Sequence, residues 1–123
     1  MAEALIIDDN RTTADALGQM LNVLGFNTRV AYGSGAAMTI LAGGFTPSFV
    51  CLDINMPGVN GLEILAYLRR EPRLIPVPVL VITSDDQPET RRKVMKLGAN
   101  VLIIKPATID ALEDALKKVK FLK

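Results

Sequence analysis

Acidic, hydroxyl and basic side chains stand directly after short apolar runs at four places in this chain. In chain order they are Asp8 and Asp9 after residues 4–7, Asp53 after 49–52, Thr83 after 79–82, and Lys105 after 101–104. Such runs are typical of strands buried on both faces of a parallel sheet. Parallel strands end on the same edge of their sheet, and open α/β sheets hold their ligands there. We therefore expect these five side chains to form one site.

The charge of this predicted site indicates what it binds. Asp8, Asp9 and Asp53 contribute −3 and Lys105 contributes +1, which leaves −2 if all four are ionised. Crowded carboxylates either take up protons or bind a cation. The chain has no histidine, and a set of oxygen donors favours Mg²⁺ over Zn²⁺. We expect Mg²⁺ at this site, beside a phosphoryl group that Thr83 and Lys105 contact.

The segments between the apolar runs have the spacing of helices. The first spans about residues 13–24 and stops at Gly25, and Ser34 is expected to cap the second. Asn60 with Glu63 resembles a capping box at the start of the third. Pro88 suits the first turn of the fourth, which Gly98 ends.

The last predicted helix buries Ile109, Leu112, Leu116 and Val119. Strands and helices thus alternate five times, with 27–31 as the weakest strand prediction. This order predicts an α/β fold with a parallel sheet and helices on both faces.

Composition restricts the class of protein. The chain has 123 residues, 50% of them apolar, which suits one domain spanning 1–123. Its single cysteine, Cys51, lies in an apolar run, so we expect a buried thiol and no disulfide framework. No signal segment or membrane-length apolar run is present, which favours a soluble cytoplasmic protein. No basic stripe with interleaved aromatics supports direct nucleic-acid binding.

Four of these motifs together resemble the receiver domain of bacterial two-component response regulators. They are Asp8-Asp9, the segment 53–61 (Asp-Ile-Asn-Met-Pro-Gly-Val-Asn-Gly), Thr83-Ser84, and Gly98-Ala99 leading to Lys105-Pro106. The resemblance covers essentially the whole chain. It implies a flavodoxin-like, doubly wound (βα)5 fold with strand order 2-1-3-4-5. It also implies a stand-alone receiver similar to the chemotaxis regulator.

The resemblance assigns roles to individual residues. Asp53 would accept a phosphoryl group from a sensor histidine kinase or phosphotransfer protein. Asp9, Asp53 and the backbone carbonyl of Asn55 would ligate Mg²⁺, and Asp8 would do so mainly through water. Thr83 and Lys105 would contact the phosphoryl oxygens, and the Lys105–Pro106 bond is predicted to be cis. The expected protein is a switch that hydrolyses its own acyl phosphate and binds a downstream effector, with no turnover of an external substrate.

Other interpretations of the same residues remain. Asp8, Asp9 and Asn10 could have no role other than capping a helix, and Asp53 could be a turn residue. Thr83 could be an ordinary strand-end hydroxyl, and Lys105 could be a solvated lysine. A haloacid dehalogenase-like phosphatase also uses an aspartate, a hydroxyl and a lysine around Mg²⁺, but needs an acid where this chain has Asn10. A third possibility is a receiver-like interaction module that is never phosphorylated. Dinucleotide or flavin binding is disfavoured because the loop after the first apolar run is not glycine-rich.

One residue departs from the receiver pattern. Leu102 stands three residues before Lys105, where receivers usually carry Tyr or Phe. A leucine offers neither a hydroxyl nor a flat ring to move between solvent and a buried slot. We therefore expect phosphorylation to move Thr83 but to shift the surface of 91–96, Leu102 and the last helix only weakly, or to signal through another surface.

Overall fold

The computed structural model describes residues 2–56 and 60–123, and in this part of the chain five strands alternate with five helices. The elements are β1 (Glu3–Ile7), α1 (Arg11–Val23), β2 (Asn27–Ala31), α2 (Ser34–Ala42), β3 (Phe49–Leu52), α3 (Gly61–Arg70), β4 (Val79–Thr83), α4 (Pro88–Leu97), β5 (Val101–Ile104) and α5 (Ile109–Lys118). The predicted alternation is confirmed, including the weak prediction of β2.

All neighbouring strands are parallel, and the sheet order is β2-β1-β3-β4-β5. This is the predicted flavodoxin-like, doubly wound fold. Its register decides where the strands end: Ile7 pairs with both Ala31 and Leu52, and Thr83 pairs with Ile104. The residues after β1 and β3 therefore leave the sheet side by side, as do those after β4 and β5.

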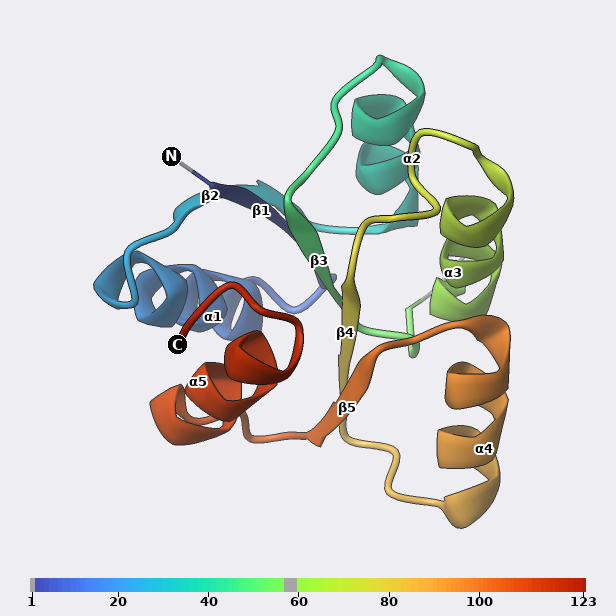
Figure 1. Cartoon of the computed structure of the whole chain (residues 1–123). Coiled ribbons are helices and arrows are strands. Elements are labelled where there is room, and N and C mark those ends of the chain that lie inside the picture. The colour runs from blue at the N-terminus through green and yellow to red at the C-terminus, as the bar shows by residue number, and fades with distance from the viewer. Residues whose placement is uncertain (1, 57–59) are drawn as a thin grey trace.

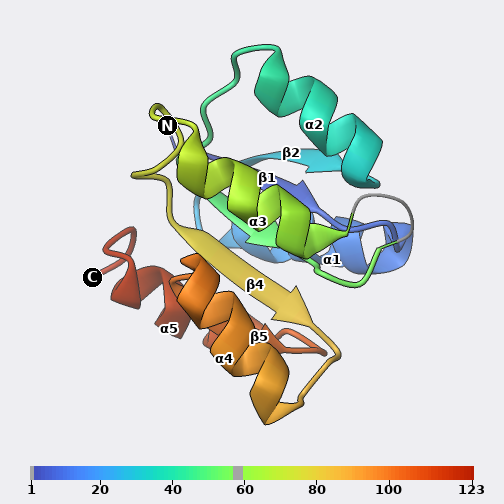
Figure 2. The same ribbon diagram turned by 90° about the vertical axis from the view of Figure 1, so that its right-hand side faces the viewer.

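The helices form a layer on each face of the sheet. Helices α1 and α5 cover one face, and α2, α3 and α4 cover the other (Figures 1 and 2). Each strand supplies both layers because alternate side chains point to opposite faces. In β1, Leu5 and Ile7 pack with α2, α3 and α4, whereas Ala4 and Ile6 pack with α1 and α5. Burial on both faces explains why the strands are continuous apolar runs.

The ends of the helices match most of the sequence signals. Asn60 Oδ1 accepts hydrogen bonds from the N–H groups of Leu62 and Glu63, which fixes the start of α3. Pro88 is in the first turn of α4, and Gly98 ends that helix in the left-handed conformation. Residues 57–59 of the segment 53–61, which carries part of the family resemblance, lie outside the described residues.

Two expectations about helix ends are wrong. Ser34 does not cap α2, because the helix begins one residue earlier than expected. Gly33 is the N-cap, and Ser34 is the first helical residue and is buried. Ile109 is not in the core, since 40% of it is exposed. It is the first residue of α5, directly after the cap Thr108, and lies before the turn that packs on the sheet.

The structure also tests the expectation of a buried Cys51 thiol and shows the lengths of the helices. Cys51 is buried in β3, and this burial raises the pKa of its thiol to about 12, so it stays protonated at neutral pH. The prediction of a buried thiol is confirmed. In residues 2–56 and 60–123, no helix is both long and apolar enough to cross a membrane.

Candidate functional site at the carboxyl edge of the sheet

The backbone hydrogen bonds of the sheet continue one residue beyond the strand ends and hold the site residues. Asp8 N donates to Ala31 O at 3.1 Å, and Asp53 N donates to Ile7 O at 2.9 Å. Lys105 N donates to Thr83 O at 2.8 Å. The site is therefore built on the sheet itself, which positions side chains more rigidly than a free loop would.

Lys105 joins two of the three predicted acids. Its Nζ lies 2.9 Å from Asp8 Oδ2 and 3.3 Å from Asp53 Oδ2. Asp8 and Asp53 are nearly inaccessible, with 1% and 6% of each residue exposed. The Lys105–Pro106 peptide bond is cis, as predicted. The site residues expected from the sequence are thus brought together by contacts between separate strands.

Burial and charge act against each other on these groups. Burial raises the pKa of Asp53, and together with the negative charge of Asp8 it outweighs the Asn55 N–H and the Lys105 ammonium, which lower that pKa. For Lys105, burial lowers the pKa. The hydrogen bond and charge of Asp8 and the charge of Asp53 raise it by more than burial lowers it, so the pKa of Lys105 is raised overall. Lys105 is therefore a cation at neutral pH, and Asp53 pays a desolvation cost for its charge.

Thr83 lies at the end of β4 and is fully buried. Its Oγ1 accepts a hydrogen bond from Asn55 Nδ2 at 3.4 Å and another from Asp85 N at 3.3 Å. Asn55 N in turn donates to Asp53 Oδ1 at 3.2 Å. Thr83 Oγ1 thus accepts twice, and within residues 2–56 and 60–123 its proton has no acceptor, so it can bond a new one.

The three acids are close enough to share a cation. One carboxylate oxygen from each of Asp8, Asp9 and Asp53 lies within 4.8 Å of the others, and Asp9 is the exposed member of the group. The donor set contains only oxygen, which fits Mg²⁺ and does not fit a soft metal. The backbone carbonyl of Asn55 remains a predicted further ligand.

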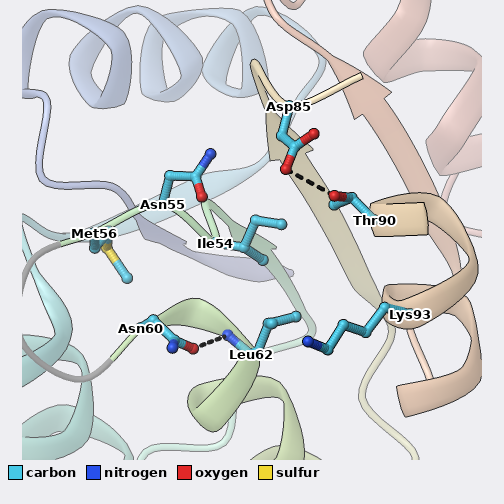
Figure 3. A pocket seen from close by; sticks show the side chains of 8 residues that line it. All are labelled: Ile54, Asn55, Met56, Asn60, Leu62, Asp85, Thr90 and Lys93. Carbon is cyan, nitrogen blue, oxygen red and sulfur yellow. Dashed lines mark hydrogen bonds between the residues drawn. The ribbon is translucent and has the colours of Figure 1, made fainter. Parts of the chain in front are cut away.

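The sequence did not predict the environment of Asp85, which lies two residues after Thr83. A cavity of about 520 Å³ opens here between the loop after β3, the start of α3 and α4. Its lining residues are Ile54, Asn55, Met56, Asn60, Leu62, Asp85, Thr90 and Lys93 (Figure 3). Thr90 Oγ1 donates to Asp85 Oδ2 at 2.7 Å, and Gln87 N donates to Asp85 Oδ1 at 3.0 Å. An Asp two residues before Gln87-Pro88 is a local signal for such a turn.

A second cavity, of about 400 Å³, is lined in part by Lys105. Its walls come from α1 and from the segment after β5, and they include Leu17, Met20, Pro106 and Ala107. Asn55 thus lines the cavity beside α4, and Lys105 lines the cavity beside α1.

Comparison with known proteins agrees with this geometry. The family model of the response regulator receiver domain matches residues 4–117. The chain belongs to this family. Receiver domains of the CheY type are signalling switches and not enzymes of the ordinary substrate-turnover kind.

Curated relatives match over nearly their full length. The chain is 32% identical over 117 residues to the chemotaxis protein CheY of Pseudomonas aeruginosa, covering 94% of this chain and 93% of the relative. It is 35% identical over 116 residues to chemotaxis protein CheY-3 of Vibrio cholerae, covering 94% and 88%.

Solved structures agree on the fold. The chemotaxis protein CheY4 of Vibrio cholerae superposes with a TM-score of 0.88 at 24% identity, over 97% of this chain and 98% of that one. A response regulator from Burkholderia pseudomallei, solved with a phosphorylated aspartic acid, a calcium ion and citrate, has a TM-score of 0.83 at 28% identity, over 94% and 66%.

Proposed function

We propose that this receiver domain accepts a phosphoryl group on Asp53 in a Mg²⁺-dependent reaction and thereby switches a surface that binds a downstream partner. One observation carries the proposal: the buried Asp53 carboxylate is held by Lys105 within the same acidic group as Asp8 and Asp9. The solved relative with a phosphorylated aspartic acid and a calcium ion supports the same chemistry.

The chain's own groups suit phosphoryl transfer. An Asp53 Oδ attacks phosphorus, the bond from phosphorus to the donor's histidine nitrogen breaks, and that nitrogen keeps the electron pair. Lys105 lies where its ammonium pairs with a phosphoryl oxygen, and the free proton of Thr83 can bond a second oxygen. Such reactions depend mainly on positioning and on charge neutralisation.

Asp8, Asp9 and Asp53 would hold the cation, together with the predicted carbonyl of Asn55. Bound Mg²⁺ supplies positive charge that offsets the phosphoryl oxygens as they approach the acids. The phosphoryl donor would be a sensor histidine kinase or a phosphotransfer protein. The apolar walls beside Lys105, which include Leu17, Met20 and Pro106, offer such a donor a contact surface next to the reacting atoms.

The phosphatase interpretation is less well supported. It needs a proton donor two residues after Asp8, and this position is Asn10, whose amide cannot act as an acid. Asn10 instead caps α1, with its Oδ1 accepting from Thr13 N at 3.0 Å. No specific contact favours the interpretation as a module that is never phosphorylated. A helix cap alone would not require Lys105 to bind both Asp8 and Asp53.

Incubation with acetyl phosphate and Mg²⁺, followed by intact-mass measurement, tests the proposal. The wild type should gain the mass of one phosphoryl group, whereas Asp53→Asn and EDTA-treated wild type should gain none. Asp114→Asn changes an exposed acid on α5 and should behave as wild type. Absence of the adduct on the wild type, or its presence on Asp53→Asn, would contradict the proposal. Steady turnover of a phosphoester would point to the phosphatase.

A further inference from the structure

Two side chains outside the acidic group, Arg11 and Tyr32, lie beside it where β2 ends. Arg11 is the first residue of α1 and follows Asp9 by two positions. Tyr32 directly follows β2, and the O atom of Ala31, the last residue of that strand, accepts the hydrogen bond from Asp8 N. Arg11 and Tyr32 therefore lie at the same carboxyl edge of the sheet as the candidate site.

The ring of Tyr32 holds the guanidinium of Arg11. Arg11 Cζ lies 4.2 Å from the centroid of the ring, which is a cation–π contact. The ring is itself fixed, because Tyr32 Oη donates to Asp15 Oδ1 at 2.6 Å. This hydrogen bond is the largest of the causes that raise the pKa of Tyr32, so the hydroxyl stays a donor at neutral pH. The direction of the Arg11 side chain is thus determined by contacts from both β2 and α1.

The cation–π contact leaves the charge of Arg11 without a counterion. Asp15 lies one helical turn after Arg11, a spacing at which acids and bases often pair, but its Oδ1 accepts from Tyr32 instead. Within residues 2–56 and 60–123 the ion pairs involve Arg29, Lys105 and Lys117, and none involves Arg11. The exposed guanidinium of Arg11 offers several donors in one plane, the geometry that suits a carboxylate or a phosphate.

Helix stability does not explain a cation at this position. The N-terminus of a helix carries partial positive charge and favours acidic side chains. The first turn of α1 has no acidic residue and begins with Arg11. Asp9, the exposed member of the acidic group, lies two residues earlier. A cation at the exposed side of a group of acids attracts anions that the acids alone would repel.

We propose that Arg11 is a recognition residue for small anionic phosphoryl donors such as acetyl phosphate, and that Tyr32 is the positioning residue that directs its guanidinium. Asp8, Asp9, Asp53 and Lys105 together carry −2 when ionised, which repels an approaching phosphate. Arg11 offsets part of this repulsion on the exposed side of the site. The same charge opposes the binding of Mg²⁺. This inference deepens the function proposed above and rests on it.

Arg11→Gln tests the proposal because its two expected effects have opposite signs. At saturating Mg²⁺, the rate constant for adduct formation from acetyl phosphate should fall about threefold, as for the loss of one unit charge near the site. The affinity for Mg²⁺ without a phosphoryl donor, followed through the Asp9 and Asn55 amide resonances, should rise by about the same factor. Added salt should reduce both effects. A substitution that merely disturbed the acids would weaken both reactions.

Matched variants separate charge from structure. Arg11→Lys keeps the charge and should keep most of the rate with acetyl phosphate. Arg29→Gln is the control, since Arg29 also lies over a ring, 4.0 Å from the centroid of Phe45, but pairs with Glu3 at the start of β1. It should change neither the rate nor the affinity for Mg²⁺. Phosphoramidate carries less negative charge than acetyl phosphate at neutral pH, so its rate should respond less to Arg11→Gln.

Tyr32→Ala tests the positioning role, because it keeps the charge of Arg11 and removes the ring. It should lower the acetyl phosphate rate by less than Arg11→Gln does, and it should have no further effect in an Arg11→Gln background. An equal loss of rate in Arg29→Gln, or a loss of both rate and Mg²⁺ affinity in Arg11→Gln, would overturn the proposal. A wild type that gains no phosphoryl group would refute the proposed function, whereas equal adduct rates for wild type and Arg11→Gln would refute this inference alone.

Discussion

The Asp53 carboxylate is buried among groups that only partly compensate its charge. Because burial raises its pKa in the folded protein, the folded state binds this proton more tightly than the unfolded state does. The stabilising effect of that proton is complete below the unfolded pKa of about 3.9. It is lost as the pH rises through the higher folded value, so ionised Asp53 destabilises the fold at neutral pH.

We therefore expect Asp53→Asn to raise the melting temperature at pH 7 in EDTA. The gain should shrink as the pH falls towards 4, because the wild-type carboxyl then takes up its proton. Thermal unfolding of both proteins across this range measures the effect, with the exposed Asp114→Asn as control. A lower melting temperature for Asp53→Asn at pH 7 would show that the Lys105 contact outweighs the desolvation.

Lys105 partly neutralises two buried carboxylates at once. Replacing it with Met should destabilise the Mg²⁺-free protein by about 3 kcal/mol, since Asp8 and Asp53 would stay buried without their counterion. Denaturant unfolding measures this cost, and added Mg²⁺ should recover part of it by binding the same acids.

The exposed Lys117–Glu113 pair, 3.8 Å apart, provides the control for this prediction. Lys117→Met should change stability by less than about 1 kcal/mol. Equal effects of the two substitutions would mean that Lys105 acts as an ordinary surface lysine. Failure of Mg²⁺ to stabilise Lys105→Met would argue against a cation site at the three acids.

At the scale of elements, the start of α3 determines how closely that helix approaches the loop that carries Asp53. A Cβ on Gly61 would lie 2.4 Å from Asp53 O and 2.4 Å from Ile54 Cα, and both atoms belong to the backbone. Gly61 N also donates to Ile54 O at 3.1 Å. Only glycine permits this contact, which fixes the loop that carries Asp53 and Asn55.

Gly61→Ala should therefore destabilise the protein by roughly 2–3 kcal/mol, because backbone must shift to relieve the clash. It should also slow adduct formation on Asp53. Gly35→Ala in α2 meets no atom within 4 Å and should be neutral or slightly stabilising. Denaturant midpoints and adduct rates compare the two, and a Gly61→Ala protein indistinguishable from wild type would refute this account of the loop.

At the scale of the whole molecule, signalling requires that a change at Asp53 reach a surface. Leu102 is half-buried and packs against the core that includes α4, so it has no separate outward position stabilised by a polar group. Arg69 meanwhile holds Gly98 and Asn100. Both features oppose a large rearrangement around β5.

We expect beryllofluoride to change amide chemical shifts strongly near Asp53 and Thr83, but only weakly over residues 98–112. Comparison of spectra with and without the probe checks this expectation. A cooperative change over 98–112 as large as that around Asp53 would show that Leu102 does not limit the coupling. Leu102→Tyr, which supplies a ring and a hydroxyl, should enlarge the response in this segment.

The order of elements and the identity of the acidic site could be predicted from the sequence, because both depend on local pattern. Apolar runs mark buried strands, and a polar residue directly after such a run lies at the strand's end wherever the strand sits in the sheet. Asp8, Asp53, Thr83 and Lys105 were found in this way. The weakest of the strand predictions was β2, whose exposed and partly buried residues alternate.

The pairing of these groups was decided by tertiary structure. Lys105 and Asp8 are 97 residues apart, and only the strand register brings Nζ within 2.9 Å of Oδ2. The exposure of Ile109 and the bonds of Asp85 to Thr83 and Thr90 also depend on how a helix is placed against the sheet. Periodicity reports which face of an element is apolar, but burial and hydrogen bonding depend on the neighbours that the assembled fold provides.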